Sequence, residues 1–328
     1  MKRVLCSHKV VSIAVLSCVA VLCLTVHVHA AEFQPTKPIQ LIAAAAPGGG
    51  SDLLARTIAQ VVASEKLSPQ PLIVSNIPGA GSAIGTTQVA RMKGDTHTLL
   101  VYNSASTSGL LTAGKGAATI RDLTMIAQFA TDEQLIVVRS DSRFKSVADI
   151  VAESKKKENA VSLAGADQAD RICSRLFEKA AGIKTRFIQF NSSGEAMTAL
   201  LGGHVDMIWA NASEFGSQYE AKMVIPLVVA QEKRFPMFKD VPTFKESGLD
   251  VIFQFYRGVV APPGLPPEVV TYYEGMMKKL NDSQAWKQQY LDKYMLNPAW
   301  QGHKEFTKTV ADSEVVFGET LKALGVIK

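Results

Sequence analysis

The chain has 328 residues, 47% of them hydrophobic, and carries a formal net charge of +5. This length is enough to bury the cores of two domains. The basic residues Lys2, Arg3 and Lys9 lie in the first thirty positions and no acidic residue does, so the rest of the chain carries only +2. A charge so close to neutral argues against a nucleic-acid-binding protein.

Residues 1–30 have the layout of a secretory signal peptide. Residues 10–31 carry no formal charge, and the Val-His-Ala of residues 28–30 is a small-residue cleavage site. We therefore expect cleavage after Ala30 and a periplasmic protein. One alternative is an uncleaved membrane anchor, for which the apolar run is barely long enough. The other is a lipoprotein attached at Cys18, which follows a lipobox-like Val-Leu-Ser.

Cysteine usage indicates that burial alone must stabilise the fold. Cys6, Cys18 and Cys23 are lost with the signal peptide, which leaves Cys173 as the single cysteine of the exported part. No internal disulfide can then form, although the export route leads to an oxidising compartment. We interpret Cys173 as a small core residue rather than a metal ligand.

From residue 39 onward, short apolar runs alternate with helical patterns. Residues 39–44, 72–75 and 98–102 predict strands, and residues 51–66 and 83–92 predict helices between them. This order is typical of a parallel α/β layer.

A second alternating set predicts a second lobe. Its strands are expected over residues 135–138, 161–164, 186–190, 206–210 and 225–230, and its helices over residues 147–157, 168–181 and 195–201. An aromatic strand, residues 251–260, and a mostly helical tail follow. Because the tail is too poor in strands to stand alone, we assign residues 31–130 and 251–328 to one lobe and residues 131–250 to the other.

Three glycines precede the first helix, in the sequence APGGGSD of residues 46–52. Glycines between a strand and a helix let the backbone approach a ligand and leave first-turn N–H groups free to donate, so the loop predicts an anion site. No lysine follows before Lys66, which argues against a triphosphate-binding loop. The helix dipole favours a carboxylate at Asp52 by about 0.3–1 kcal/mol. The alternative is that Ser51 and Asp52 merely cap the helix.

A second glycine loop, PGAGSAIG at residues 78–85, follows the next strand. It matches a dinucleotide fingerprint only loosely, because it does not follow the first strand and no acidic residue ends the strand after it; we expect no redox cofactor. Two such loops at the carboxyl ends of neighbouring parallel strands open into one crevice. Backbone N–H groups there, with Ser51, Ser82, Asn103 and Ser104, could hold a small carboxylate without any arginine.

Two loops of the second lobe, residues 163–170 and 190–196, are expected to face that crevice. Each has the alternative of an ordinary connection that caps a helix. Arg171 is either a partner for a second ligand carboxylate or a solvated helix residue. Phe190 and Trp209 either line the cleft or belong to the core.

Five stretches of the chain, in their order, resemble the extracytoplasmic receptors of tripartite tricarboxylate transporters, also called the Bug family. They are residues 36–56, 79–86, 190–208, 240–248 and 256–270, so the resemblance covers nearly all of the exported chain. It implies a two-lobed periplasmic binding protein of the Venus flytrap type II class, an α/β fold in which each lobe is a mainly parallel sheet flanked by helices. It also implies a monomer that binds a small organic carboxylate, works with the transporter's membrane subunits, uses no cofactor or metal, and is not an enzyme.

The resemblance further implies the ligand-binding positions. They are Gly49, Gly50, Ser51, Asp52, Ser82, Ala83 and Ile84 in the first lobe, which act largely through main-chain donors, and Ala166, Asp167, Asn191, Ser192 and Ser193 in the second. Ser51 and Tyr256 stand where many members have tryptophan, and Asn191-Ser192 replaces a pair that usually contains glycine. Because each departure is expected on or near the ligand surface, aliphatic dicarboxylates, tricarboxylates, amino acids and aromatic acids all stay open.

An exported hydrolase acting on a small carboxylic ester or amide is the alternative function. Such an enzyme needs a nucleophile with a base, and His97, His204 and His303 are the only histidines of the exported part. No Gly-x-Ser-x-Gly elbow occurs in the sequence. We therefore predict a binding protein.

Overall fold

The computed structural model describes residues 33–166, 168–190 and 192–328. The predicted signal peptide, residues 1–30, lies outside these ranges, and so do Asp167 and Asn191. Across the described ranges, no helix combines the length and the apolar character that a bilayer crossing requires.

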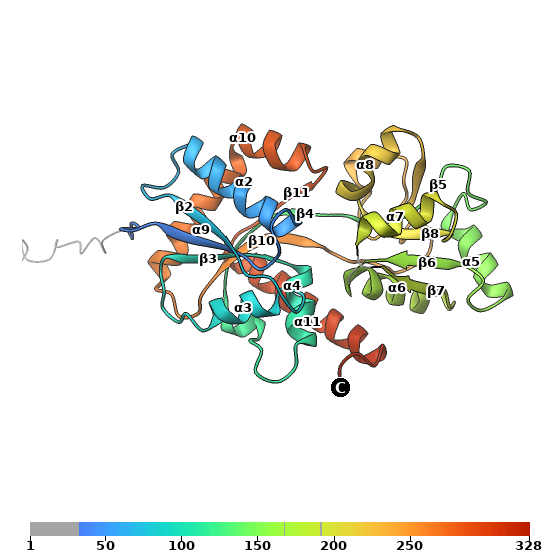
Figure 1. The fold of residues 1–328 in the computed structure, drawn as a ribbon, viewed down its shortest axis with the longest axis horizontal. Coiled ribbons are helices and arrows are strands. Elements are labelled where there is room, and N and C mark those ends of the chain that lie inside the picture. Colours follow the sequence, from blue (N-terminus) through green and yellow to red (C-terminus); the bar gives the residue numbers. More distant parts are fainter. Residues whose placement is uncertain (1–32, 167, 191) are drawn as a thin grey trace, which may run out of the picture. The chain divides into compact units, whose positions relative to one another are not determined.

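In the described chain, six strands form the first sheet, in the order β11-β4-β10-β3-β1-β2 (Figure 1). Their bounds are β1 (Ile39–Ala43), β2 (Leu72–Asn76), β3 (Thr98–Asn103), β4 (Thr124–Thr131), β10 (Tyr256–Ala261) and β11 (Asn297–Gln301). β1 pairs in parallel with β2 and β3, as the sequence predicts. β10 is antiparallel to β3 and β4, and β11 is antiparallel to β4.

The second sheet has five strands within the described residues, in the order β7-β6-β8-β5-β9. Their bounds are β5 (Gln134–Arg139), β6 (Ser162–Gly165), β7 (Arg186–Gln189), β8 (Met207–Asn211) and β9 (Val224–Val229). β6 pairs in parallel with β7 and β8, whereas β5 is antiparallel to β8 and β9. The predicted α/β fold with two mainly parallel sheets is confirmed, and each sheet is mixed: β10 and β11 run against the other strands of the first sheet, and β5 runs against those of the second. The reason is that β5 and β10 enter directly from the other sheet, without the crossover helix that a parallel neighbour requires.

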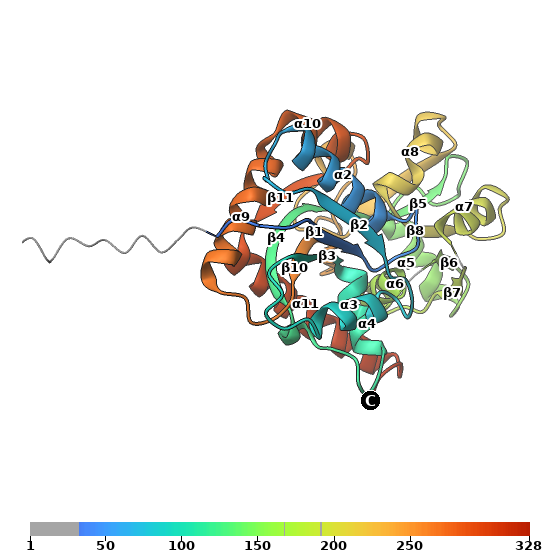
Figure 2. The same ribbon diagram turned by 60° about the vertical axis from the view of Figure 1, so that its left-hand side comes forward.

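Helices cover both faces of each sheet (Figures 1 and 2). On the first sheet, α2 (Gly50–Ser64), α9 (Pro267–Asp282) and α10 (Gln284–Trp286) lie on one face, and α3 (Ala83–Ala90), α4 (Ser104–Thr112) and α11 (His303–Ala323) on the other. On the second sheet, α5 (Val147–Lys156) and α6 (Gln168–Ala181) lie opposite α7 (Ser193–Leu201) and α8 (Ala212–Glu220). A π-helical turn, Lys287–Asp292, follows α10, and single 3-10 turns occur at Ile120–Asp122 and Pro236–Phe238.

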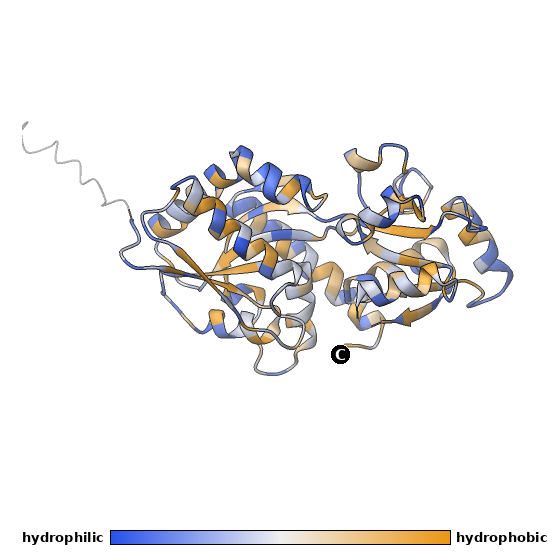
Figure 3. Cartoon of the chain, turned by 45° about the horizontal axis from the view of Figure 1, so that its top comes forward, coloured by the Kyte–Doolittle hydropathy of each residue, from blue (hydrophilic) through white to orange (hydrophobic). Residues whose placement is uncertain are grey.

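The strands of both sheets are largely hydrophobic (Figure 3), and their buried side chains form cores with residues of the covering helices. Cys173 on α6 is fully buried in one core of the second sheet, as predicted. Trp209 on β8 belongs to the same core and donates its indole N–H to Ser174 Oγ at 2.8 Å. Of the two interpretations of Trp209, the core interpretation is therefore confirmed.

The C-terminal helix α11 contributes to the cores of both sheets. Phe306 and Val310 pack in the core of the first sheet, whereas Phe317 and Leu321, farther along the same helix, pack against the second. The tail thus joins the first sheet, as expected, and also supports the second. The lobe boundaries at residues 130 and 250 stay predictions.

The chain passes directly between the sheets at two places. Residues 132–133 join β4 to β5, and residues 230–255 join β9 to β10. The predicted aromatic strand is therefore too long at its start, because only Tyr256–Ala261 forms ladder hydrogen bonds and residues 251–255 belong to the connection.

Candidate ligand-binding site

A cavity of about 460 Å³ opens between the two sheets and is lined by the starts of four helices. These contribute Gly50 and Ser51 from α2, Ser82 before α3, Asn103 and Ala105 from the start of α4, and Asn211, Ser213 and Glu214 from the start of α8. Phe255, Arg257, Tyr290 and Tyr294 line another part of the wall. Because a helix N-terminus carries partial positive charge and unpaired N–H groups, this lining suits an anion.

The start of α2 is open toward this cavity. Gly49 is the N-cap residue, so no side chain caps the helix, and the first intrahelical bond is donated by Leu53 to the Gly49 carbonyl at 3.0 Å. The N–H groups of Gly50, Ser51 and Asp52 precede that bond and are available to a ligand. Gly48 has φ +82°, in the left-handed region that favours glycine. The glycines of this loop thus shape an open helix start, as anion binding there would require.

The Asp52 carboxylate fixes the glycine loop through a hydrogen bond to Gly48 and is not among the residues described as lining the cavity. It is 2% exposed and accepts hydrogen bonds from Gly48 N at 2.8 Å, Arg56 Nε at 2.9 Å and Asn76 Nδ2 at 2.9 Å. The bond from Arg56 lowers its pKa most, to about 2, against the opposing effect of burial. Because the carboxylate of Asp52 already accepts these bonds, only the backbone N–H of Asp52 can contact a ligand. This contact stays a prediction.

Ser51 and Asn103 meet at the cavity wall. Asn103 Nδ2 donates to Ser51 Oγ at 3.2 Å, and Asn103 Oδ1 accepts from Ser106 N at 3.0 Å, which caps α4. Ser104, expected beside them, is instead buried: its hydroxyl donates to Gln254 O and accepts from Tyr256 N, both at 3.0 Å. Its side chain ties α4 to the connection before β10 and is not among the lining residues described.

The second glycine loop brings only Ser82 to the cavity wall. The side chains of Ala83 and Ile84 line a separate surface hollow, where Ile84 is 54% exposed. Their N–H groups bond within the loop, Ala83 N to Ala80 O at 3.1 Å and Ile84 N to Gly79 O at 3.4 Å. Their roles as main-chain donors to a ligand stay predictions.

The loops of the second lobe, where they are described, form hydrogen bonds at the starts of the helices that follow them. Ser192 Oγ accepts from Glu195 N at 3.2 Å and caps α7, so the helix-cap interpretation holds for this loop. Ser193 Oγ donates to Glu214 Oε1 at 2.6 Å, and Ala166 N donates to Asp170 Oδ2 at 2.6 Å. None of Ala166, Ser192 and Ser193 is among the described lining residues, and their binding roles stay predictions.

The cavity wall also contains an arginine that is not among the predicted binding residues. Arg257 is 13% exposed and forms an ion pair with Asp132, which is 0% exposed, through Nη2 and through Nε at 3.2 Å. Burial works to lower the pKa of Arg257, but the charge of Asp132 raises it, and the net shift is upward. Burial also raises the pKa of Asp132, and Arg257 opposes that effect. The cavity wall therefore includes an arginine that the predicted site did not, and carboxylate binding without an arginine stays a prediction.

Alternation along β10 decides which side chains reach the cavity. Side chains of successive strand residues point to opposite faces, so Arg257 faces the cavity and Tyr256 does not. Tyr256 is fully buried, hydrogen-bonds through its hydroxyl to Thr107, and stacks on Tyr102 at 6.4 Å between ring centroids. The expectation that Tyr256 lies on or near the ligand surface is wrong. Alternation around the Tyr-Arg-Gly motif is the signal that could have identified Arg257.

The remaining candidates lie away from the cavity. Arg171 is exposed on α6, and Phe190 packs against the core of the second sheet. His97 Nε2 accepts from Thr36 N at 3.2 Å, and His303 Nδ1 lies 2.5 Å from Met125 O. No histidine is among the described lining residues, so these residues supply no imidazole base beside the serines. Within the described ranges, no group of three or more histidine, cysteine or acidic side chains could hold a metal ion.

Comparison with known proteins identifies the relatives of this chain. Residues 54–326 match the family model described as "Tripartite tricarboxylate transporter family receptor". A protein of Agrobacterium vitis, encoded in the TAR-I ttuE-ttuC' intergenic region, is 31% identical over 245 residues, which cover 74% of this chain and 70% of that protein. A TctC solute binding protein from Polaromonas is 28% identical and has a TM-score of 0.77, covering 89% of this chain and 100% of that one. The periplasmic binding protein BugD is 25% identical with a TM-score of 0.72, covering 90% and 99%.

Proposed function

Because the chain belongs to the receptor family of the tripartite tricarboxylate transporters, we propose that it captures a small organic carboxylate in the cavity between its two sheets. The observation that carries this proposal is the open start of α2, which lies in a cavity lined by the starts of three other helices. We keep Gly49, Gly50, Ser51, Asp52, Ser82, Ala83, Ile84, Asn103, Ser104, Ala166, Asp167, Asn191, Ser192 and Ser193 as the proposed contacts.

Hydrogen bonds to peptide groups can replace the solvation that a carboxylate loses. Taking a carboxylate out of water costs several kcal/mol unless it is well hydrogen-bonded. The N–H groups at the start of α2 and the hydroxyl of Ser51 supply such bonds without a net positive charge. This matters here because Asp132 already balances the charge of Arg257.

Arg257 is proposed to recognise a second acceptor group on the ligand. Its Nε and Nη2 are directed at Asp132, whereas Nη1 lies against the glycine loop: a Cβ added to Gly50 would be 3.0 Å from Nη1. A guanidinium has five N–H donors in a fixed plane, so some remain after the bonds to Asp132. This position favours an acid whose second carboxylate or hydroxyl lies next to the first.

Closure of the two lobes is proposed to complete the site. The ligand shifts the population toward a closed form only through its extra affinity for that form. The membrane subunits of the transporter then recognise the closed receptor. We propose that residues 1–30 direct the chain to the periplasm and are cleaved there, and that the receptor acts as a monomer.

Thermal unfolding of the purified protein with a panel of aliphatic, amino and aromatic acids tests the proposal. We expect one class of acid to raise Tm, and Ser51→Ala to weaken the effect. Gln88→Ala is the matched control, because Gln88 lines the separate hollow beside Ile84. The acid should be recovered unchanged, whereas the hydrolase alternative requires turnover of an ester or amide. The absence of any stabilising acid, or an unchanged shift in Ser51→Ala, contradicts the assignment.

A further inference from the structure

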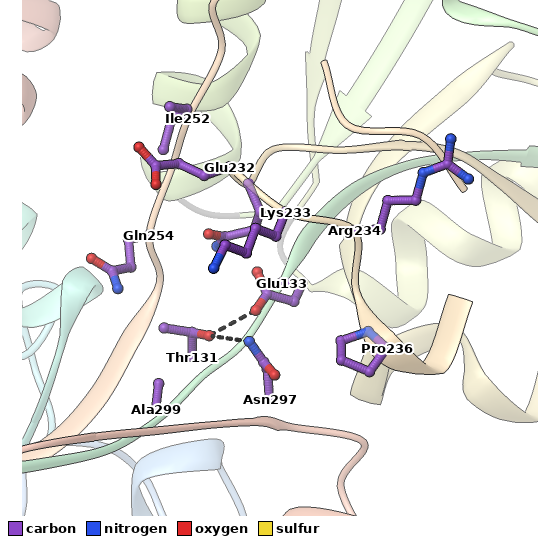
Figure 4. A pocket seen from close by; sticks show the side chains of 11 residues that line it. Thr131, Glu133, Glu232, Lys233, Arg234, Pro236, Ile252, Gln254, Asn297 and Ala299 are labelled. Atoms are coloured by element: carbon purple, nitrogen blue, oxygen red, sulfur yellow. Dashed lines mark hydrogen bonds between the residues drawn. The ribbon is translucent and has the colours of Figure 1, made fainter. Parts of the chain in front are cut away.

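A second cavity, of about 530 Å³, lies where the chain passes between the sheets (Figure 4). We call it the crossover cavity. Its walls come from the end of β4 and the connection after it, with Thr131 and Glu133, and from β11 with Asn297. The segment after β9 contributes Gln231, and the segment before β10 contributes Gln254. Its described lining residues do not overlap those of the proposed carboxylate site.

The carboxyl group of Glu133 lies at this cavity, and only one of its two oxygens has a hydrogen-bond partner among the described residues. The residue is 1% exposed; its Oε1 accepts from Thr131 Oγ1 at 2.7 Å, and its Oε2 has no hydrogen-bond partner among the described residues. Figure 4 shows Thr131 bonded to both Glu133 and Asn297. Burying an ionised carboxyl group in this way costs free energy unless a hydrogen-bond donor reaches it.

The amide groups of Gln231 and Asn297 lie beside Glu133 and lower its pKa, but neither forms a hydrogen bond with its Oε2. Gln231 Nε2 donates to Phe253 O at 3.1 Å, and Asn297 Nδ2 donates to Thr131 Oγ1 at 3.4 Å. Each of these amides also has a second N–H and a side-chain oxygen that can accept hydrogen bonds. A guest that brings N–H donors could bond the unsatisfied Oε2 of Glu133 and reach these amide oxygens.

The charged groups near Glu133 do not neutralise it. Asp132, the preceding residue, raises the pKa of Glu133 rather than lowering it. Arg234 is held by both carboxylate oxygens of Glu246 at 3.0 Å. Glu232 and Lys233 also line the cavity, but both are exposed, and no ion pair in the described chain joins Lys233 to Glu133.

We propose that the crossover cavity binds a small organic cation with N–H donors, an ammonium or a guanidinium, through Glu133 Oε2 and the side-chain oxygens of Gln231 and Asn297. Such a cation supplies both the missing charge and the missing hydrogen bonds, and charge-assisted bonds of this kind are the strong ones. The site is independent of the proposed carboxylate site.

Calorimetric titration of the purified protein with methylguanidinium and ethylammonium, at constant ionic strength, tests the proposal. Tetramethylammonium is the matched probe, because it has the same charge and no N–H donor. Burial raises the pKa of Glu133 to about 7, so the ionised fraction, and with it the affinity, should rise about tenfold between about pH 6 and pH 8. Saturable binding of the N–H cations alone, with this pH profile, is the expected result.

Two variants assign the binding to Glu133. Glu133→Gln keeps the acceptor for Thr131 and removes the charge, so it should weaken binding at least tenfold and abolish the pH profile. Glu232→Gln, which neutralises an exposed carboxylate of the same cavity, should change affinity less than twofold. Equal binding of tetramethylammonium, or unchanged binding in Glu133→Gln, overturns the proposal. If that variant does not fold, the comparison of probes and the pH profile of the wild type decide.

Discussion

Replacing Glu133 by glutamine should remove a pH dependence from the stability of this protein. Burial raises the pKa of the Glu133 carboxyl group from 4.5 to about 7, and the bond from Thr131 offsets this only in part. A difference of one in pKa corresponds to about 1.4 kcal/mol, so the shift corresponds to about 3 kcal/mol of unfolding free energy.

The sign follows from which state binds the proton. Between about pH 4.5 and pH 7 the folded state keeps the proton of Glu133 and the unfolded state releases it. The free energy of unfolding must therefore fall as the pH rises through this window, and it levels off above about pH 7. Asp52, with a pKa of about 2, titrates below the window. The wild type should thus lose up to about 3 kcal/mol that Glu133→Gln retains.

Urea unfolding at a series of pH values, without added amines or guanidinium, measures this difference. The combined fluorescence of Trp209 in the core of the second sheet and of Trp286 and Trp300 beside Phe129 of the first sheet reports on the unfolding of both. We expect the two proteins to converge near pH 5 and to diverge toward pH 8, with the variant more stable there. Parallel stability curves for wild type and variant across this range would refute the assignment of a raised pKa to Glu133.

Three further substitutions test the glycine loop and the ion pair of Arg257 with Asp132. Asp52→Asn removes the charge that holds the glycine loop and Arg56, and should lower the free energy of unfolding by about 1–3 kcal/mol in urea; an unchanged value would contradict that role. Arg257→Met leaves Asp132 buried without its partner and should cost about 3–5 kcal/mol, measured by Tm, with partial recovery when Asp132→Asn is added. Gly50→Ala places a Cβ 3.0 Å from Arg257 Nη1; we expect weaker binding of the best acid with little loss of stability, and unchanged affinity would argue against a ligand at the start of α2.

Local patterns predicted many of the helices and strands. Helix α6 has the bounds that its apolar spacing predicts, Gln168–Ala181. β4 was missed because it is buried along seven of its eight residues, so it lacks the alternation that marks a strand with one exposed face. β11 was missed because it is short, partly exposed and contains a proline.

The candidate site was predictable only where a local motif builds it. Four lining residues lie directly after a strand or at the start of a helix: Gly50, Ser51, Ser82 and Asn103. Such positions lie at the carboxyl edge of a sheet, so the sequence alone could predict where they are. The pairing of Arg257 with Asp132 joins residues 125 positions apart, and no local pattern links them. The unsatisfied oxygen of Glu133 likewise depends on how segments before β10 and in β11 pack around it.

The amino-acid sequence by itself determined the helix and strand periods, the open glycine loop and the family to which the chain belongs, because each depends on residues close together along the chain. Only the tertiary structure decided that Asp52 turns away from the cavity, that Arg257 enters it, and that Glu133 is buried beside a second one. The physical reason is that burial and charge pairing depend on neighbours in space, and here those neighbours come from distant segments that meet only once both sheets have formed.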